Sequence, residues 1–338
     1  MPMKSLAAFS KGTSIKSELA ADSTTTFRVV VDKEMTDHIR SWRLILLLAL
    51  LALTFFGALY VSLNNIRSVV SNAQDPDSTF LYLKLLTSTD GAMPPFHVFL
   101  NFLGPLLGIA LGFDAINSEQ NNGTLIRLMA QPVYRDNLIL AKSASALILV
   151  GTLFFTLVLL MIGAGLYITG VLIEPVEVLR IFTFTVVAVV YVGFWLSLSI
   201  LFSIAFKQTA TSALAAIGVW LFFTVFYQIV VNLAVAAFIP RQTIQTEAEM
   251  VGYNEMVLNI LRLAPSQLFS DATTTLLMPS VRSLGPMTME QMAGAIPSPL
   301  PFTESLMVVC PQLSGLLAAT FLCFAYSYYL FMRREIRS

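Results

Sequence analysis

Charge is scarce in this sequence of 338 residues, because Asp, Glu, Lys and Arg together make up only 12% of it. A soluble domain averages about 25% charged and about 45–50% apolar residues, whereas 56% of this chain is apolar. One soluble core cannot hide so much apolar surface, so the composition predicts a protein whose solvent is lipid. The formal net charge is zero, and therefore no excess of positive charge favours nucleic acid as a partner.

Residue types that bind metals or carry out catalysis are equally sparse. The two cysteines, Cys310 and Cys323, lie in one apolar run, where a helix would place them about 20 Å apart on nearly opposite faces. We expect them to be unpaired, buried side chains. His38 and His97 are isolated, and the chain has no HExxH or CxxC motif. The sequence predicts neither a metal site nor a catalytic site, which disfavours an intramembrane enzyme.

Long apolar runs dominate the rest of the chain, and a membrane helix needs about 20 mainly apolar residues. The runs lack the alternation typical of barrel strands. The sequence therefore predicts an all-α membrane protein with six transmembrane helices, each free of Asp, Glu, Lys and Arg, at residues 44–66, 91–113, 143–173, 181–206, 208–240 and 305–332.

The distribution of positive charge predicts which side each connection faces. Fourteen of the Lys and Arg residues precede the first span, follow the last one, or lie in the 114–142 connection and at Lys207. The opposite side holds six over a greater length. Because Lys and Arg favour the cytoplasm, both termini are predicted to be inside. Residues 1–26 are predicted to be mobile, and residues 333–338 to form a cytoplasmic tail.

Two segments outside the spans have amphipathic patterns. Residues 27–43 carry five charges within nine positions among apolar residues, which favours a helix along the inner membrane surface; the alternative is an early start of the first span. The external segment 241–304 is too long for a simple connection. Its apolar residues from Tyr253 to Ala264 recur at helical spacing, which predicts a helix at the interface or capping the bundle, with a second short helix after Pro265. A short turn at 174–180 is predicted to join the third and fourth spans.

The cytoplasmic connection between the second and third spans contains the stretch NSEQNNGTLIRLMAQPVYR, residues 117–135. Gly123 is predicted to end a polar helical extension of the second span, because glycine tolerates the left-handed conformation at helix ends. Thr124 can cap the short helix that follows, and Pro132 would end that helix. The apolar face of this helix and an acid beside it suit contact with a soluble protein. The alternative is that the apolar face dips into lipid headgroups. The face is formed by Leu125, Leu128 and Met129, and the acid is Glu119.

Residues 113–142, FDAINSEQNNGTLIRLMAQPVYRDNLILAK, resemble the FD-x-I…E…GTL…L…PV-x-R…K signature of ABC-2-type ABC transporter permeases. They resemble in particular the branch that includes the permease for maturation of a copper enzyme, nitrous oxide reductase. Stretches before the first and last spans, VDKEMTDHIRSWR and LAPSQLFSDATTTLL, are also similar, so the resemblance covers about residues 27–335. The matching positions are Glu119, Gly123, Thr124, Leu125, Pro132, Val133, Arg135 and Lys142.

The resemblance implies that the 114–142 loop holds a coupling helix that docks on a separate ATPase subunit. It assigns this contact to Glu119, Gly123, Thr124, Leu125, Pro132 and Arg135, and the apolar face of the predicted short helix adds Leu128 and Met129. It also implies two ATPase copies that bind ATP and Mg, and a second permease chain in a homodimer, with a paired paralogue as the alternative. The expected direction of transport is export, and the expected location is the cytoplasmic (inner) membrane of a prokaryote. This chain has no G-x-x-x-x-G-K-[ST] phosphate loop, so ATP is expected on the partner. The alternative is an ATPase-linked scaffold or sensor that does mechanical work without moving cargo.

Few polar groups lie within the predicted spans, which contain no full charge, and no proton relay or ion site is predicted. Asn101, Gln228 and Asn232 are candidates for a transport pathway, although such amides also join neighbouring helices by hydrogen bonds. The abundance of Phe and Leu favours an amphipathic or lipid-like cargo.

Overall fold

The computed structural model of the whole chain describes residues 27–70, 80–88, 91, 93–124, 135–238, 246–281 and 299–333. The predictions for the N-terminal 26 residues, and for all of the C-terminal tail except Arg333, fall outside these ranges. Within them the chain is helical and contains no strand, and six helical segments are long and apolar enough to cross a membrane. These observations confirm the predicted all-α class with six spans.

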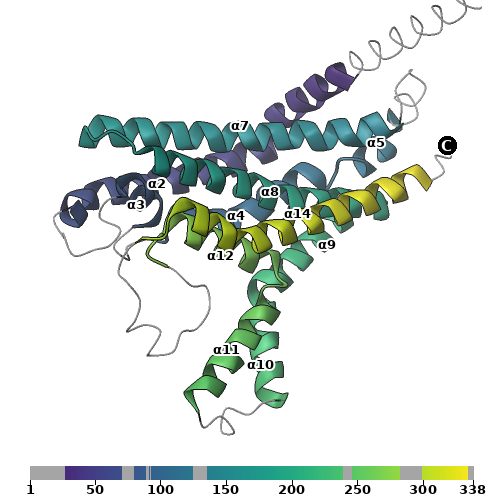
Figure 1. Cartoon of the computed structure of the whole chain (residues 1–338). Helices are drawn as coiled ribbons and strands as arrows, with labels where there is room; N and C mark the ends of the chain where they lie inside the picture. The colour runs from purple at the N-terminus through teal and green to yellow at the C-terminus, as the bar shows by residue number, and fades with distance from the viewer. Residues whose placement is uncertain are drawn as a thin grey trace, which may run out of the picture.

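The helices follow one another along the chain and form an elongated bundle, with one arm that diverges from it (Figure 1). Residues 27–40 form the first helix. The other elements are α2 (Trp42–Val70), α3 (Leu81–Thr87), α4 (Phe96–Gly112), α5 (Asn117–Asn121), α7 (Arg135–Thr169), α8 (Pro175–Ala205), α9 (Thr209–Leu221), the π-helix η1 (Phe222–Phe226), α10 (Tyr227–Phe238), α11 (Glu247–Leu261), α12 (Pro265–Leu277) and α14 (Phe302–Arg333).

Two spans begin more than five residues earlier than the uncharged runs that predicted them. Helix α7 starts at Arg135, and α8 starts at Pro175, so the predicted turn at 174–180 is wrong for most of its length. Proline favours the first helical position, and the Glu177 carboxylate accepts the backbone N–H of Glu174 at 3.2 Å. The predicted spans were defined as runs without Asp, Glu, Lys or Arg. They therefore began only after Lys142 and Arg180, two charged residues that are buried near the starts of these helices.

Helix α8 is the centre of the bundle. It is 72% buried over its most apolar window, whereas the fifth and sixth spans are each 17% buried. It packs closely against α4, which presents Gly104, Gly108 and Gly112 at four-residue intervals. A Cβ atom at Gly108 would lie 2.6 Å from the carbonyl oxygen of Val192, and only glycine permits this backbone approach. Small residues at this spacing allow close packing of membrane helices, so α4 and α8 are held in direct backbone contact.

The fifth span leaves the bundle as an arm made of α9, η1 and α10, and α11 returns beside α10 (Figure 1). Val231 and Val235 of α10 form a buried apolar cluster with Leu261 of α11 and its partly buried neighbours. The hydroxyl of Tyr227 donates to the carbonyl oxygen of Ile260 at 2.7 Å. The amphipathic segment predicted from Tyr253 onward is therefore helical as far as Leu261, and its apolar face packs against the fifth span.

The buried guanidinium of Arg180 organises the end of the bundle where α8 begins. It donates to the carbonyl oxygen of Leu276 at 3.2 Å, to the hydroxyl of Ser305 at 3.1 Å and to the carbonyl oxygen of Leu300. Leu276 lies in the last turn of α12, where carbonyl groups lack intrahelical partners and a cation is favourable. Arg180 thus joins α8 to the end of α12 and the start of α14.

Candidate functional site

The connection that follows α4 forms a compact elbow, defined here as residues 114–124. Helix α5 occupies its centre, and Gly123 follows with φ of +67°. This is the left-handed conformation predicted for a glycine that ends a helix. The hydroxyl of Thr124 donates to the carbonyl oxygen of Glu119 at 3.2 Å, which closes the turn. The predicted coupling residues Leu125, Leu128, Met129 and Pro132 lie outside the described residues.

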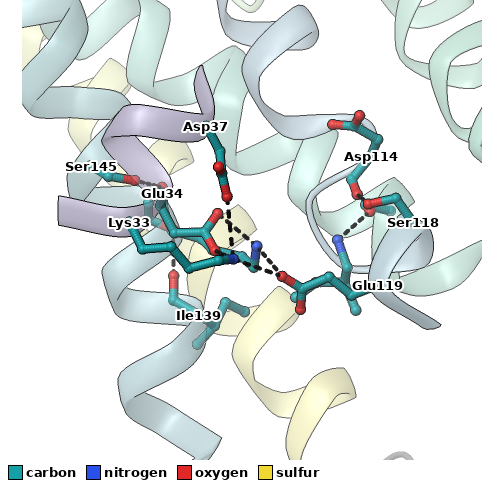
Figure 2. A network of polar contacts seen from close by, with 12 residues as sticks. Lys33, Glu34, Asp37, Asp114, Ser118, Glu119, Ile139 and Ser145 are labelled. Carbon is teal, nitrogen blue, oxygen red and sulfur yellow. Dashed lines mark hydrogen bonds and ion pairs between the residues drawn. The ribbon is translucent and has the colours of Figure 1, made fainter. Parts of the chain in front are cut away.

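A buried lysine in α7 joins the elbow to the N-terminal helix. The Nζ atom of Lys142 lies 2.8 Å from Oε2 of Glu34 and 2.8 Å from Oε1 of Glu119. The exposed fractions of these side chains are 7% for Lys142, 7% for Glu34 and 12% for Glu119. Figure 2 shows the two carboxylates turned toward each other across the ammonium groups, with Asp37 close by. Three elements far apart in sequence therefore meet in one ion cluster.

Lys33 completes the cluster on its solvent side. Its Nζ atom lies 3.0 Å from Oε1 of Glu34, 3.3 Å from Oδ2 of Asp37 and 4.0 Å from Oε1 of Glu119. Burial by itself would lower the pKa of Lys33, but the surrounding carboxylates raise it above the ordinary value. The N-terminal helix thus contributes both an acid and a base to the contact with the elbow.

The cluster holds Glu34 in its charged form. Burial by itself would raise the pKa of Glu34, but charge attraction and hydrogen bonds from Lys142 and Lys33 lower it below its ordinary value. Beside the cluster, burial is the main cause that lowers the pKa of His38. Breaking a buried ion pair by removing one partner costs about 3–5 kcal/mol, because the other charge stays buried without compensation. Removal of Lys142 or Glu34 alone is therefore expected to destabilise the contact between the N-terminal helix and the elbow at neutral pH.

Further bonds attach the elbow to α2 and α8. The guanidinium of Arg43 lies 2.6 Å from Oδ2 of Asp114. The hydroxyl of Ser203, at the end of α8, accepts the backbone N–H groups of Ile116 at 3.0 Å and Asn117 at 3.2 Å. A polar cavity of about 410 Å³ lies between the elbow and the N-terminal helix. The elbow is thereby bonded to α2, α7 and α8.

The charged members of the predicted coupling set are engaged within the chain. The carboxylate of Glu119 faces Lys142. The guanidinium of Arg135 donates to the carbonyl oxygen of Phe331 at 2.8 Å and lies 5.3 Å from the centre of the Phe331 ring. Arg135 thus joins the start of α7 to the end of α14, and these two ends lie near α5 at one end of the bundle (Figure 1).

The contribution of Glu34 was missed at the sequence level, although a signal was present. Val30, Val31 and Glu34 are 7%, 8% and 6% exposed, so the acid occupies the apolar face of its helix. An acid on an apolar face indicates a buried counter-charge. This face packs against the protein, whereas Ile39 of the same helix is exposed, so the predicted position along the membrane surface stays a prediction.

The polar residues predicted for a pathway fall in two places. The side-chain oxygen of Asn101 accepts the hydroxyl of Tyr191 at 3.0 Å, so it contributes to the contact between α4 and α8. Gln228 and Asn232 lie one turn apart on α10, and both are exposed on the chain. The structure therefore places Gln228 and Asn232 close together on an exposed face of α10, whereas Asn101 lies in the contact between α4 and α8.

Comparison with known proteins agrees with this architecture. Residues 28–336 match the family model described as ABC-2 family transporter protein. A stretch of 133 residues is 27% identical to the "Probable ABC transporter permease protein NosY" of Stutzerimonas stutzeri, which covers 38% of this chain and 47% of that relative. The alignment thus spans less than half of the relative.

Proposed function

Since the chain belongs to the ABC-2 family of transporter permeases, we propose that it is the transmembrane subunit of an ATP-driven exporter, driven through the elbow by a separate ATPase subunit. The observation that carries this proposal is the fastening of the elbow: Lys142, Arg43 and Ser203 each bond it to a different span. A loop attached in this way transmits displacement to the bundle. ATP and Mg would be bound by the ATPase.

The proposed mechanism is mechanical. The permease lies in the inner membrane of a prokaryote, with two ATPase subunits on its cytoplasmic side. ATP binding closes the two subunits on each other, and each subunit then displaces one elbow. Because helices satisfy their backbone hydrogen bonds internally, they transmit this force as stiff rods. The backbone contact at Gly108 passes it from α4 to the central helix α8. ATP binds the closed state more tightly than the open state, and this difference in affinity shifts the equilibrium toward closure.

We expect the coupling contact to depend on the apolar face predicted at Leu125. Leu125→Asp should abolish co-purification of the ATPase with the permease, because a carboxylate desolvated in an apolar contact weakens binding by at least about tenfold. The matched control is Leu172→Asp, the same change at a side chain that is 79% exposed in the turn between α7 and α8. Retention of the ATPase by both variants would show that the segment directly after the elbow, which begins at Leu125, is not the docking site.

The second permease chain is proposed to meet this one along the arm formed by the fifth span. An amide exposed to hydrocarbon lacks the hydrogen bonds that water supplies, and Gln228 and Asn232 are exposed on α10. A pathway between two copies would give these side chains polar surroundings. The arm is 17% buried within the chain, which leaves most of its apolar surface for lipid or the second copy.

A cross-linking experiment in native membranes tests this arrangement. With Cys310 and Cys323 replaced by serine, Gln228→Cys should form a covalent dimer with a short bifunctional thiol reagent. The control is Leu159→Cys on α7, whose side chain is 67% exposed and should give monomer. Equal dimer yields at both positions would contradict the proposed interface.

A further inference from the structure

The N-terminal helix, residues 27–40, packs on the protein through the face that carries Glu34. Its other faces are exposed, as shown by Val29 at 67% and Ile39 at 56%. Lys142 bonds Glu34 and Glu119 at the same 2.8 Å distance, so one ammonium group is paired with an acid on the helix and with an acid on the elbow. No other ammonium group among the described residues makes two contacts this short in the cluster.

We propose that Lys142 locks the N-terminal helix to the elbow, so that the two move as one rigid unit when the ATPase closes. This inference rests on the proposed function, since it concerns how the elbow passes on its displacement. Lys142 and Glu34 act as positioning residues that set the spacing between helix and elbow.

The charges of the cluster explain why the unit stays intact during movement. If the elbow moved away from the helix, Lys142 could stay in contact with only one of the two acids, and the other carboxylate would lose its closest cation. Lys33 bonds to Glu34 and lies 4.0 Å from Glu119, which adds a second link across the same junction. Joint movement avoids this cost, because all of these contacts are kept.

Distances between spin labels test the rigid unit in the assembled complex. Labels are placed at Val29→Cys on the helix and Asn122→Cys on the elbow, with Cys310 and Cys323 replaced by serine and unlabelled permease in excess. Asn122 is exposed, as is Val29. We expect the same distance distribution in the nucleotide-free complex and in the complex trapped with ATP and vanadate. A second pair, Asn122→Cys with Leu172→Cys, spans the bundle and should shift on trapping.

Each combination of results decides between the two claims. A shift in the second pair alone supports the rigid unit. A shift in both pairs overturns the rigid unit and leaves the coupling function standing. A shift in neither pair, or in the first pair alone, contradicts elbow-driven movement of the bundle and overturns both claims.

Substitution of the lysine provides a second test with a functional readout. Lys142→Met should broaden the distribution for the first pair and lower permease-dependent ATP hydrolysis by about tenfold or more, while Lys142→Arg should preserve both because it keeps the charge. The control is Lys207→Met, the same change at an exposed lysine beside the elbow, which should alter neither. A Lys142→Met complex with an unchanged distribution and unchanged hydrolysis would refute the lock. If Lys142→Met fails to fold, the unsubstituted label pairs still decide the question.

Discussion

Gly108→Ala is expected to destabilise the protein by about 1–3 kcal/mol, the usual cost of overpacking a well-packed core. A Cβ atom there would lie 2.6 Å from the carbonyl oxygen of Val192, 2.9 Å from the backbone nitrogen of Leu196 and 3.0 Å from Cβ of Trp195. Two of these three atoms belong to the backbone of α8, so no side-chain rotation relieves the clash. The two helices would have to move apart, which would loosen the most extensively buried span.

The helix propensity of alanine makes this prediction sharper. Alanine is favoured over glycine inside a helix by about 1 kcal/mol, so a loss of stability must come from the contact with α8. Gly151→Ala and Gly163→Ala on α7 are matched controls, because a Cβ atom at either position would meet none of the described residues' atoms within 4 Å outside its own helix backbone. Thermal unfolding of the purified chain in detergent should show a lower midpoint for Gly108→Ala alone. Equal midpoints for the three variants would mean that α4 and α8 are not in backbone contact.

The number of spans was predictable because hydrocarbon imposes a length and a composition on any helix that crosses it. The helix ends were less predictable, since they depend on whether a charged residue finds a buried partner. Lys142 and Arg180 are 6% and 0% exposed, and each lies inside a helix that the charge-free runs had shortened. Lys142 can lie within a helix near the membrane because two carboxylates pair with it. The sequence contains both acids but does not show that they lie beside this lysine.

The candidate site was predictable as a loop but not as an assembly. The signature placed Glu119, Gly123 and Lys142 in one connection, and glycine chemistry predicted the left-handed turn at Gly123. Glu34 joins the site from 108 residues before Lys142, and no local pattern pairs residues at that distance. The contact between α4 and α8 was also only partly predictable. The spacing of the α4 glycines is visible in the sequence, but the sequence does not show which helix packs against them.

Arg180→Leu is expected to destabilise the chain by about 3 kcal/mol or more. The guanidinium of Arg180 donates hydrogen bonds to the carbonyl oxygens of Leu276 and Leu300 and to the hydroxyl of Ser305. A buried acceptor left without a donor costs about 1–3 kcal/mol, and here three lose one at the same time. Leucine fills part of the volume but supplies no donor, so α12 and the start of α14 would separate from α8.

Two further variants identify the cause of this loss. Arg180→Lys keeps the charge, yet a single ammonium group cannot reproduce the planar fork that reaches three acceptors, so an intermediate unfolding midpoint is expected. Arg43→Leu removes an arginine that is 55% exposed and paired with Asp114, and such exposed pairs contribute about 0–1 kcal/mol. Because Arg180 lies in the first turns of α8, whose last turns contact the elbow, any Arg180→Leu protein that folds should still co-purify with the ATPase. An unfolding midpoint for Arg180→Leu equal to that of Arg43→Leu would mean that Arg180 does not hold the end of α12 and the start of α14 to α8.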